Sequence, residues 1–330
     1  MKKIVYNEEL KNRFILETCS TSNMKSLFTN VFHLVGEEEE KLGADVCTWN
    51  EEQLRVMLER LSGFRAYSSK NRENLLKRYI AWCINTGVDG ASGAIFGIET
   101  DGIASVRQKT VSGPEHLQRC LDSFLAPEQD KTADNVLRGY CWLSFSGMAD
   151  DEIVDVRTTD VDLEALVVRS GNKKYPIYRE AIPCMRILRE LSCFKYFHDG
   201  YENDFTWRVR PDGDKLLRGL RSAEPSILGI RSRLSDKSVS AFNKGAADVK
   251  ISAYRIWISG EFYRMYQKER MGDTVDFTYL ACRGIETREK NGKPYKLEAE
   301  RGKRSVDNKI NELARNYLED YNRWKLAYSV

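Results

Sequence analysis

Apolar side chains recur every three or four residues along most of the chain, which predicts a mainly helical protein. The repeats run through 5–15, 27–35, 48–61, 68–82, 114–125, 133–145, 227–234 and 308–326. A different signal lies at 166–178, where two short β-prone runs flank Gly171 and Asn172, a turn typical of a β-hairpin. The pattern therefore predicts a mainly α fold with a small β-ribbon.

Residues that typically begin and end helices define the bounds of two predicted helices between residues 45 and 87. Thr48 with Glu51, or Asn50 with Gln53, can form a capping box for the first of them, and the pattern leaves both pairings open. Ser68 is the predicted N-cap of the second helix, and Gly87 ends it. The glutamate run at 37–40 is expected to be hydrated surface.

Length and composition indicate two domains without an embedded cofactor. A Gly-, Ser- and Ala-rich stretch at 87–113 divides the 330 residues, which predicts a helical domain over 1–105 and a second domain over 106–330. The eight cysteines are dispersed without a CxxC pair, and there are three histidines, so neither a metal site nor a cofactor is predicted. No apolar run approaches the roughly 20 residues that span a bilayer, so no membrane association is predicted and the cytosol is the default location.

Charge narrows the choice of partner only slightly. The net charge is +3, but basic residues gather at 55–78, 208–255 and 283–309, whereas 37–40 and 128–162 are acidic. Local basic faces on a nearly neutral chain fit a DNA-binding protein and also fit many enzymes.

The stretch from Tyr140 to Leu163 carries the most specific signal. Its order of residue types resembles the opening of the catalytic domain of tyrosine recombinases, the phage-integrase family. The match runs without a gap over Gly147, Met148, Ala149, Glu152, Ile153, Val154, Val156, Arg157, Asp160, Val161, Asp162 and Leu163. The resemblance places the family's first catalytic arginine at Ala149, so that group is lost here.

Other sequence motifs of the family are partly present in this chain. Pro176-Ile177 and the ribbon before it resemble the family's β-ribbon, whose catalytic lysine falls on Lys173 or Lys174. The His-x-x-Arg box falls on Ser252 to Arg255, so the arginine is retained and the histidine has become serine. No tyrosine stands in a context comparable to that of the family's nucleophile; those in the C-terminal part are Tyr279, Tyr295, Tyr317, Tyr321 and Tyr328.

The helix predicted at 68–82 resembles the core-binding domain of the same family, a helical (SAM-like) domain that packs across DNA. The resemblance rests on Ser68, Ser69, Arg72, Leu76, Tyr79 and Trp82. It implies double-stranded DNA as the partner, with an oligomer on DNA left open. The predicted DNA contacts are Ser69, Lys70, Arg72, Lys77, Arg78, Lys173, Lys174, Arg231, Arg233, Tyr254 and Arg255.

The N-terminal region resembles a more specific group, the phage lytic-cycle repressors built on an integrase fold. The shared opening is Tyr6, Asn7, Lys11, Arg13 and Phe14, and Tyr79-Ile80-x-Trp82 follows later. This resemblance implies a DNA-binding regulator that maintains a prophage.

Three hypotheses follow for the function. The first is a catalytically inactive integrase-like DNA-binding protein, because each lost transition-state donor typically lowers the rate by about 10²–10³ and several are missing here. The second is an active site-specific recombinase, acting in DNA integration and recombination, with a divergent active site. The third is a helical protein-interaction module without affinity for DNA.

Overall fold

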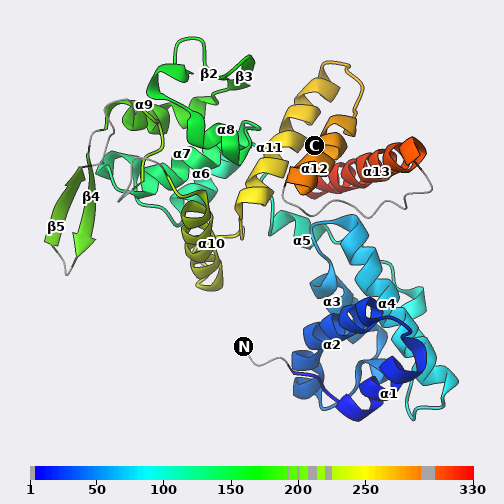
Figure 1. Ribbon diagram of the computed structural model, residues 1–330. Coiled ribbons are helices and arrows are strands. Elements are labelled where there is room, and N and C mark those ends of the chain that lie inside the picture. The colour runs from blue at the N-terminus through cyan, green and yellow to red at the C-terminus, as the bar shows by residue number, and fades with distance from the viewer. Residues whose placement is uncertain (1–3, 192, 199–200, 207–213, 220–224, 291–301) are drawn as a thin grey trace. The chain divides into compact units, whose positions relative to one another are not determined.

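The computed structural model (Figure 1) describes residues 4–191, 193–198, 201–206, 214–219, 225–290 and 302–330. It consists of two compact units. Unit 1 comprises residues 1–106 together with 276–330, and unit 2 comprises 107–275. The predicted fold class, mainly α with a small β-ribbon, is confirmed.

Unit 1 is a helical assembly around an aromatic core. Its elements are α1 (Glu8–Thr18), α2 (Ser22–Leu42), η1 (Val46–Thr48), α3 (Glu51–Leu61), α4 (Ala66–Asn85), η2 (Ala94–Gly97), α5 (Ile103–Arg107), α12 (Thr278–Lys290) and α13 (Gly302–Tyr328). Phe14 of α1 meets Phe28 of α2 and Tyr79 of α4 edge to face, with ring centroids 4.7 and 5.2 Å apart. Such pairs add specific geometry to the area they bury, so they fix how α1 and α2 pack on α4.

Of two helix-capping predictions in unit 1, one is confirmed and one is wrong. The Asn50–Gln53 capping box is confirmed, because Gln53 N donates to Asn50 Oδ1 at 2.9 Å and Asn50 N donates to Gln53 Oε1 at 3.0 Å. The prediction that Ser68 caps α4 is wrong, because the helix begins two residues earlier at Ala66. Arg65 is the N-cap residue there and makes no capping bond with its own side chain.

Unit 2 is built around α7 (Asp134–Phe145), whose residues from Asn135 to Phe145 are all buried. The other helical elements are α6 (Pro114–Asp122), η3 (Glu128–Asp130), α8 (Asp150–Asp155), η4 (Thr158–Asp160), η5 (Arg179–Ala181), α9 (Ile182–Glu190), α10 (Ile227–Asn243) and α11 (Ala253–Arg270). Helix α11 packs closely on the end of α7, since a Cβ at Gly260 would lie only 1.9 Å from the Phe145 carbonyl oxygen. Gly147 then turns the chain at φ +102°, where a Cβ would meet Arg264, so this position requires glycine.

The predicted hairpin is confirmed as part of a three-stranded antiparallel sheet in the order β1 (Val161–Asp162), β2 (Val167–Ser170), β3 (Lys173–Pro176). Ser170 pairs with Lys173, which leaves Gly171 and Asn172 as the turn. A second hairpin of β4 (Cys193–His198) and β5 (Tyr201–Thr206) was not predicted, because its alternation is interrupted by polar residues.

The grouping by contacts differs from the predicted domains at the C-terminal end. Residues 276–330 group with unit 1, whereas the sequence pattern assigns them to the second domain. The physical reason is the packing of α13, which contacts α4 as well as α12. Among the described residues, no helix combines the length and the apolar character needed to cross a membrane.

Candidate nucleic-acid interface

The predicted DNA contacts of unit 1 lie on or near α4 and are largely engaged with neighbouring groups. Lys70 forms an ion pair with Glu319 of α13. Arg72 is turned inward, because its Nη1 donates to the Leu61 carbonyl at 2.8 Å. Lys77 pairs with Glu73 one helical turn away at 2.6 Å. Most of the predicted basic face is therefore tied to the protein itself.

Two further residues of this face behave differently from each other. The guanidinium of Arg78 lies 5.3 Å from the centre of the Phe28 ring and the residue is exposed, so its charge stays accessible. Ser69 was predicted to contact DNA, but its hydroxyl donates to the Gly63 carbonyl at 3.1 Å and accepts from the Gly63 N–H at 2.8 Å. Its observed contacts fix the connection between α3 and α4.

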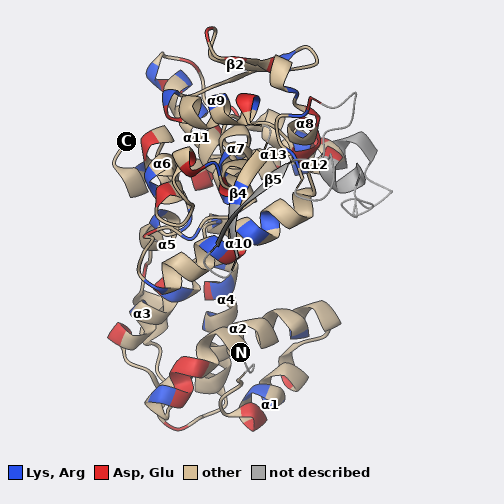
Figure 2. Cartoon of the chain, turned by 90° about the vertical axis from the view of Figure 1, so that its left-hand side faces the viewer, with Lys and Arg blue, Asp and Glu red and all other residues tan. Residues whose placement is uncertain are grey.

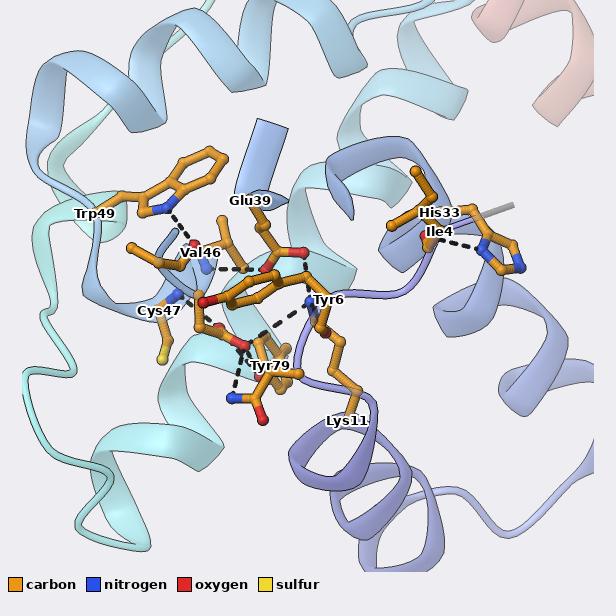
Figure 3. A network of polar contacts seen from close by, with 12 residues as sticks. Ile4, Tyr6, Lys11, His33, Glu39, Val46, Cys47, Trp49 and Tyr79 are labelled. Atoms are coloured by element: carbon orange, nitrogen blue, oxygen red, sulfur yellow. Dashed lines mark hydrogen bonds and ion pairs between the residues drawn. The ribbon is translucent and has the colours of Figure 1, made fainter. Parts of the chain in front are cut away.

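A buried polar network supports α4 from within unit 1 (Figure 3). Lys11 of α1 lies 2.5 Å from Glu39 of α2, and both side chains are completely buried. The expectation that the glutamate run is hydrated surface is therefore wrong for Glu39. Burial raises the pKa of Glu39 to about 7, although the Lys11 ammonium beside it acts in the opposite direction.

The same network reaches α4 through Asp45 and Tyr79. The Tyr79 hydroxyl donates to Asp45, at 3.0 Å from Oδ2 and 3.1 Å from Oδ1. Lys11 lies 3.8 Å from Asp45 Oδ2. These contacts join α1, α2, the segment before η1 and α4, so the network fixes the position of the predicted DNA-facing helix (Figure 3).

The N-terminus of α4 carries a carboxylate from the other end of the chain. The Ala66 N–H donates to Asp320 Oδ1 of α13 at 2.7 Å, and Arg65 Nη1 lies 3.3 Å from Asp320 Oδ2. The first N–H groups of a helix lack partners within the helix, so Asp320 satisfies one of them and caps α4. Burial raises the pKa of Asp320 to about 6.

In unit 2 the short acidic helix α8 gathers several of the predicted positions. Ala149, the position predicted from the resemblance to have lost an arginine, donates its N–H to Glu152 Oε2 at 2.7 Å. The other oxygen of Glu152 accepts from Lys173 Nζ at 2.7 Å and from the Tyr175 hydroxyl at 2.6 Å. Burial of Glu152 opposes its charge, but these hydrogen bonds outweigh that effect and lower its pKa, so it is an anion at neutral pH.

Arg231 of α10 is also neutralised by α8. Its guanidinium forms an ion pair with Asp150, and its Nε donates to the Tyr140 hydroxyl at 3.2 Å. That hydroxyl in turn donates to Asp150 Oδ1 at 2.8 Å. Partial burial opposes the charge of Arg231, yet Tyr140 and Asp150 raise its pKa, so the guanidinium stays charged beside Asp150.

In the segment of α11 predicted to match the His-x-x-Arg motif, Arg255 points inward. Arg255 is partly buried, which lowers its pKa, and its Nη1 donates to the Lys250 carbonyl at 2.8 Å. Ser252 is the N-cap residue of α11 but makes no capping bond with its side chain. Tyr254 is 40% exposed and its ring lies 6.0 Å from that of Trp257. Trp257 Nε1 donates to the Gly147 carbonyl at 3.4 Å, which ties this helix to the turn before α8.

Two predicted contacts of unit 2 have no carboxylate partner among the described contacts. Lys174 is exposed on β3 beside Lys173, and Arg233 Nε donates to the Gly229 carbonyl at 3.3 Å. Figure 2 shows the basic residues along α10, where Arg231 and Arg233 lie. Lysine and arginine side chains of this kind can bind DNA phosphates without catalysing a reaction.

Sequence reasoning missed Arg65, Asp150 and Asp320. Asp150 was visible as part of an acidic helix, but its pairing with Arg231 joins positions 81 residues apart. Asp320 and Arg65 are more distant still, at a separation of 255 residues. No sequence signal pointed to this cap, because Ser68 and not Arg65 was the predicted N-cap of the helix. Within the described ranges, no group of three or more His, Cys, Asp or Glu side chains is arranged to hold a metal ion.

Comparisons with known proteins agree with parts of this picture. Residues 5–85 match a family model described as the N-terminal core-binding domain of MrpR. The predicted helical core-binding domain thus has an independent counterpart over most of its length. No curated protein matches the chain.

Solved tyrosine recombinases and integrases are similar to the chain at low identity. The crystal structure of XerA recombinase is 10% identical, with 81% of this chain and 86% of that chain covered and a TM-score of 0.36. The Tn1549 transposon integrase in complex with transposon right end DNA is 11% identical, with coverages of 81% and 87% and a TM-score of 0.33.

Proposed function

We propose that this chain is a DNA-binding protein with an integrase fold that has lost strand-cleavage chemistry and acts as a phage or prophage transcriptional repressor in the cytoplasm. In this proposal residues 1–105 are the core-binding domain, and 106–330 are a tyrosine-recombinase-like domain without activity. Of the predicted DNA contacts, Arg78, Lys174, Arg233 and Tyr254 are the ones that the proposal takes as available in the free protein. The others, Ser69, Lys70, Arg72, Lys77, Lys173, Arg231 and Arg255, are engaged by other groups of the protein and contact DNA only where a phosphate displaces those groups.

The observation that carries the loss of catalysis is the neutralisation by α8. A recombinase needs cationic donors aimed at the non-bridging oxygens of the scissile phosphate, where charge develops. Here Asp150 pairs with Arg231 and Glu152 pairs with Lys173, while position 149 offers a methyl group. A phosphate approaching these cations meets two carboxylates that already occupy them, and like charges repel.

The residues at the other predicted active-site positions support DNA binding rather than strand cleavage. Arg255 donates to a backbone carbonyl, and Ser252 is a poor proton acceptor at neutral pH. Cations such as Arg78 and Lys174 can still contact phosphates, which gives affinity without sequence information. The match of residues 5–85 to a core-binding domain supports DNA as the partner.

A second candidate is an active recombinase with a divergent active site, which the retained Arg255 and the exposed Lys174 favour. Among the described tyrosines of the C-terminal region, Tyr317 and Tyr321 are buried, whereas Tyr279 is 47% exposed. If the chain cleaves DNA, Tyr279 is the candidate nucleophile with the best access to a phosphate.

The experiment for DNA binding measures fluorescence anisotropy of labelled duplexes from the protein's own genomic neighbourhood at several salt concentrations. The proposal expects binding that weakens steeply with salt, because each phosphate contact releases counterions. Binding that does not change with salt, or no binding to any duplex, would instead favour a protein-interaction module. A reporter gene placed behind the bound duplex then tests repression, and expression that is unaffected by the protein would contradict the repressor role.

A further inference from the structure

The contact between α13 and the beginning of α4 occupies three donors that could also bind a DNA phosphate, namely the Ala66 N–H and the side chains of Arg65 and Lys70. Asp320 accepts from the Ala66 N–H at 2.7 Å and lies against Arg65. One residue earlier, Glu319 pairs with Lys70 on the next turn of α4. Two adjacent carboxylates of α13 thus occupy the helix N-terminus and two cations of unit 1.

Other side chains align α13 on the same region. The Arg65 guanidinium lies 4.7 Å from the centre of the Tyr317 ring. Arg323 donates from Nε to the Asp101 carbonyl at 3.0 Å and from Nη1 to the Phe64 carbonyl at 3.3 Å. The contact therefore extends over two turns of α13, from Tyr317 to Arg323.

A carboxylate and a DNA phosphate are interchangeable ligands for this arrangement. Both are oxyanions that accept from helix N-terminal N–H groups and from arginine and lysine. We infer that α13 is a removable acidic cover, which occupies Arg65, Ala66 and Lys70 in the free protein and competes with the DNA backbone for them. The inference rests on the proposed DNA binding, and it adds a device that regulates it.

The contact has an exposed part and a buried part. The pair of Lys70 and Glu319 is largely exposed, with 67% and 40% of the two side chains accessible, and exposed pairs of this kind contribute little. The side chain of Asp320 beside Arg65 is only 2% exposed, so release of α13 also exposes this carboxylate. On its other side α13 is joined to α12 by apolar packing, where the Phe277 and Tyr321 rings lie 5.4 Å apart. The pair of α12 and α13 can therefore leave α4 together without dividing that apolar contact.

The test compares two charge-matched variants of the full chain. Glu319→Gln with Asp320→Asn weakens the cover, whereas Asp307→Asn with Glu312→Gln removes the same two negative charges from the same helix. Glu312 forms an ion pair with Lys309 on α13 itself, so the second variant is expected to leave the contact with α4 in place. Both variants and the natural protein are measured for affinity to the same duplex and for deuterium exchange at the Ala66 amide.

If α13 is a removable cover, deuterium exchange at the Ala66 amide is faster in the Glu319→Gln, Asp320→Asn variant than in the control variant. The same variant is expected to bind DNA roughly three- to tenfold more tightly than the control. By reciprocity, adding DNA to the natural protein also accelerates exchange at Ala66. Unchanged exchange in that variant would overturn the inference, because α13 would then not be held by these carboxylates.

The remaining outcomes separate this inference from the proposed function. Faster exchange with the same DNA affinity as the control variant would overturn the cover and leave DNA binding intact. Faster exchange with no DNA binding by the natural protein or either variant would overturn both. A fully closed cover, by contrast, gives binding only in the weakened variant, which would support the inference.

Discussion

Both units of the protein place carboxylates on the cations predicted to contact DNA, but the carboxylates come from different places. In unit 2 they belong to α8, where Asp150 pairs with Arg231 and Glu152 pairs with Lys173. In unit 1 the carboxylate on Lys70 comes from α13, 249 residues away along the chain, whereas Lys77 pairs with Glu73 on its own helix. The side chains of Asp150 and Glu152 are 32% and 16% exposed and that of Glu319 is 40% exposed, so we expect a phosphate to displace Glu319 more readily than the two carboxylates of α8.

The two units have separate hydrophobic cores, and the largest expected effect tests whether these cores unfold separately. Lys11→Met leaves Glu39 buried without its partner, and breaking a buried pair in this way typically costs about 3–5 kcal/mol. Amide exchange across the whole chain should show unit 1 destabilised and unit 2 unchanged.

The matched control is Lys11→Met combined with Glu39→Gln, which removes the uncompensated charge and should restore part of the loss. Equal loss of protection in both units would show that the two cores unfold together.

The converse variant is Gly260→Ala in unit 2. The added Cβ would collide with the Phe145 carbonyl oxygen at 1.9 Å, so α11 has to move away from α7, at a cost of roughly 1–3 kcal/mol. Urea denaturation followed by exchange should place this loss in unit 2. Gly97→Ala is the control, since nothing lies within 4 Å of its Cβ position; comparable losses in the two variants would remove packing at Gly260 as the cause.

A smaller effect of pH should appear in unit 1. The folded pKa of Glu39, about 7, lies above the ordinary value of 4.5, and that of Asp320, about 6, lies above 3.8. A raised folded pKa contributes stability that is complete below the unfolded pKa and is lost as pH rises through the folded pKa. Unit 1 should therefore lose on the order of 1 kcal/mol between pH 6 and pH 8 through Glu39 alone.

Urea denaturation at the two pH values measures this loss, and Glu39→Gln should remove most of it. If the natural protein and Glu39→Gln respond to pH identically, the assignment to Glu39 is wrong.

The smallest expected effect is a change in the salt dependence of DNA binding when either of two neighbouring lysines on β3 is replaced. Lys174→Gln should lower the slope of log affinity against log salt by about 0.9, the value for one lost phosphate contact. Lys173→Gln should change it less, because Glu152 already holds Lys173. Equal changes in the two slopes would show that α8 does not neutralise its neighbour.

Features set by local sequence were predictable, and those set by distant contacts were not. The Asn50–Gln53 box, the hairpin at Gly171 and Asn172 and the buried helix α7 depend on spacing and turn chemistry within a few residues. The burial of Glu39 and the cap at Ala66 depend on Lys11 and Asp320, which no periodicity connects to them. The pairing of Arg231 with Asp150 was missed for the same reason.

The central claim is that the protein binds DNA without cutting it, and covalent trapping tests it most directly. The protein is incubated with duplexes from its genomic neighbourhood, and each sample is divided between a native gel and a denaturing quench. A salt-sensitive shift on the native gel with no covalent protein–DNA band after denaturation is the predicted result. A covalent band that disappears in Tyr279→Phe would contradict the account.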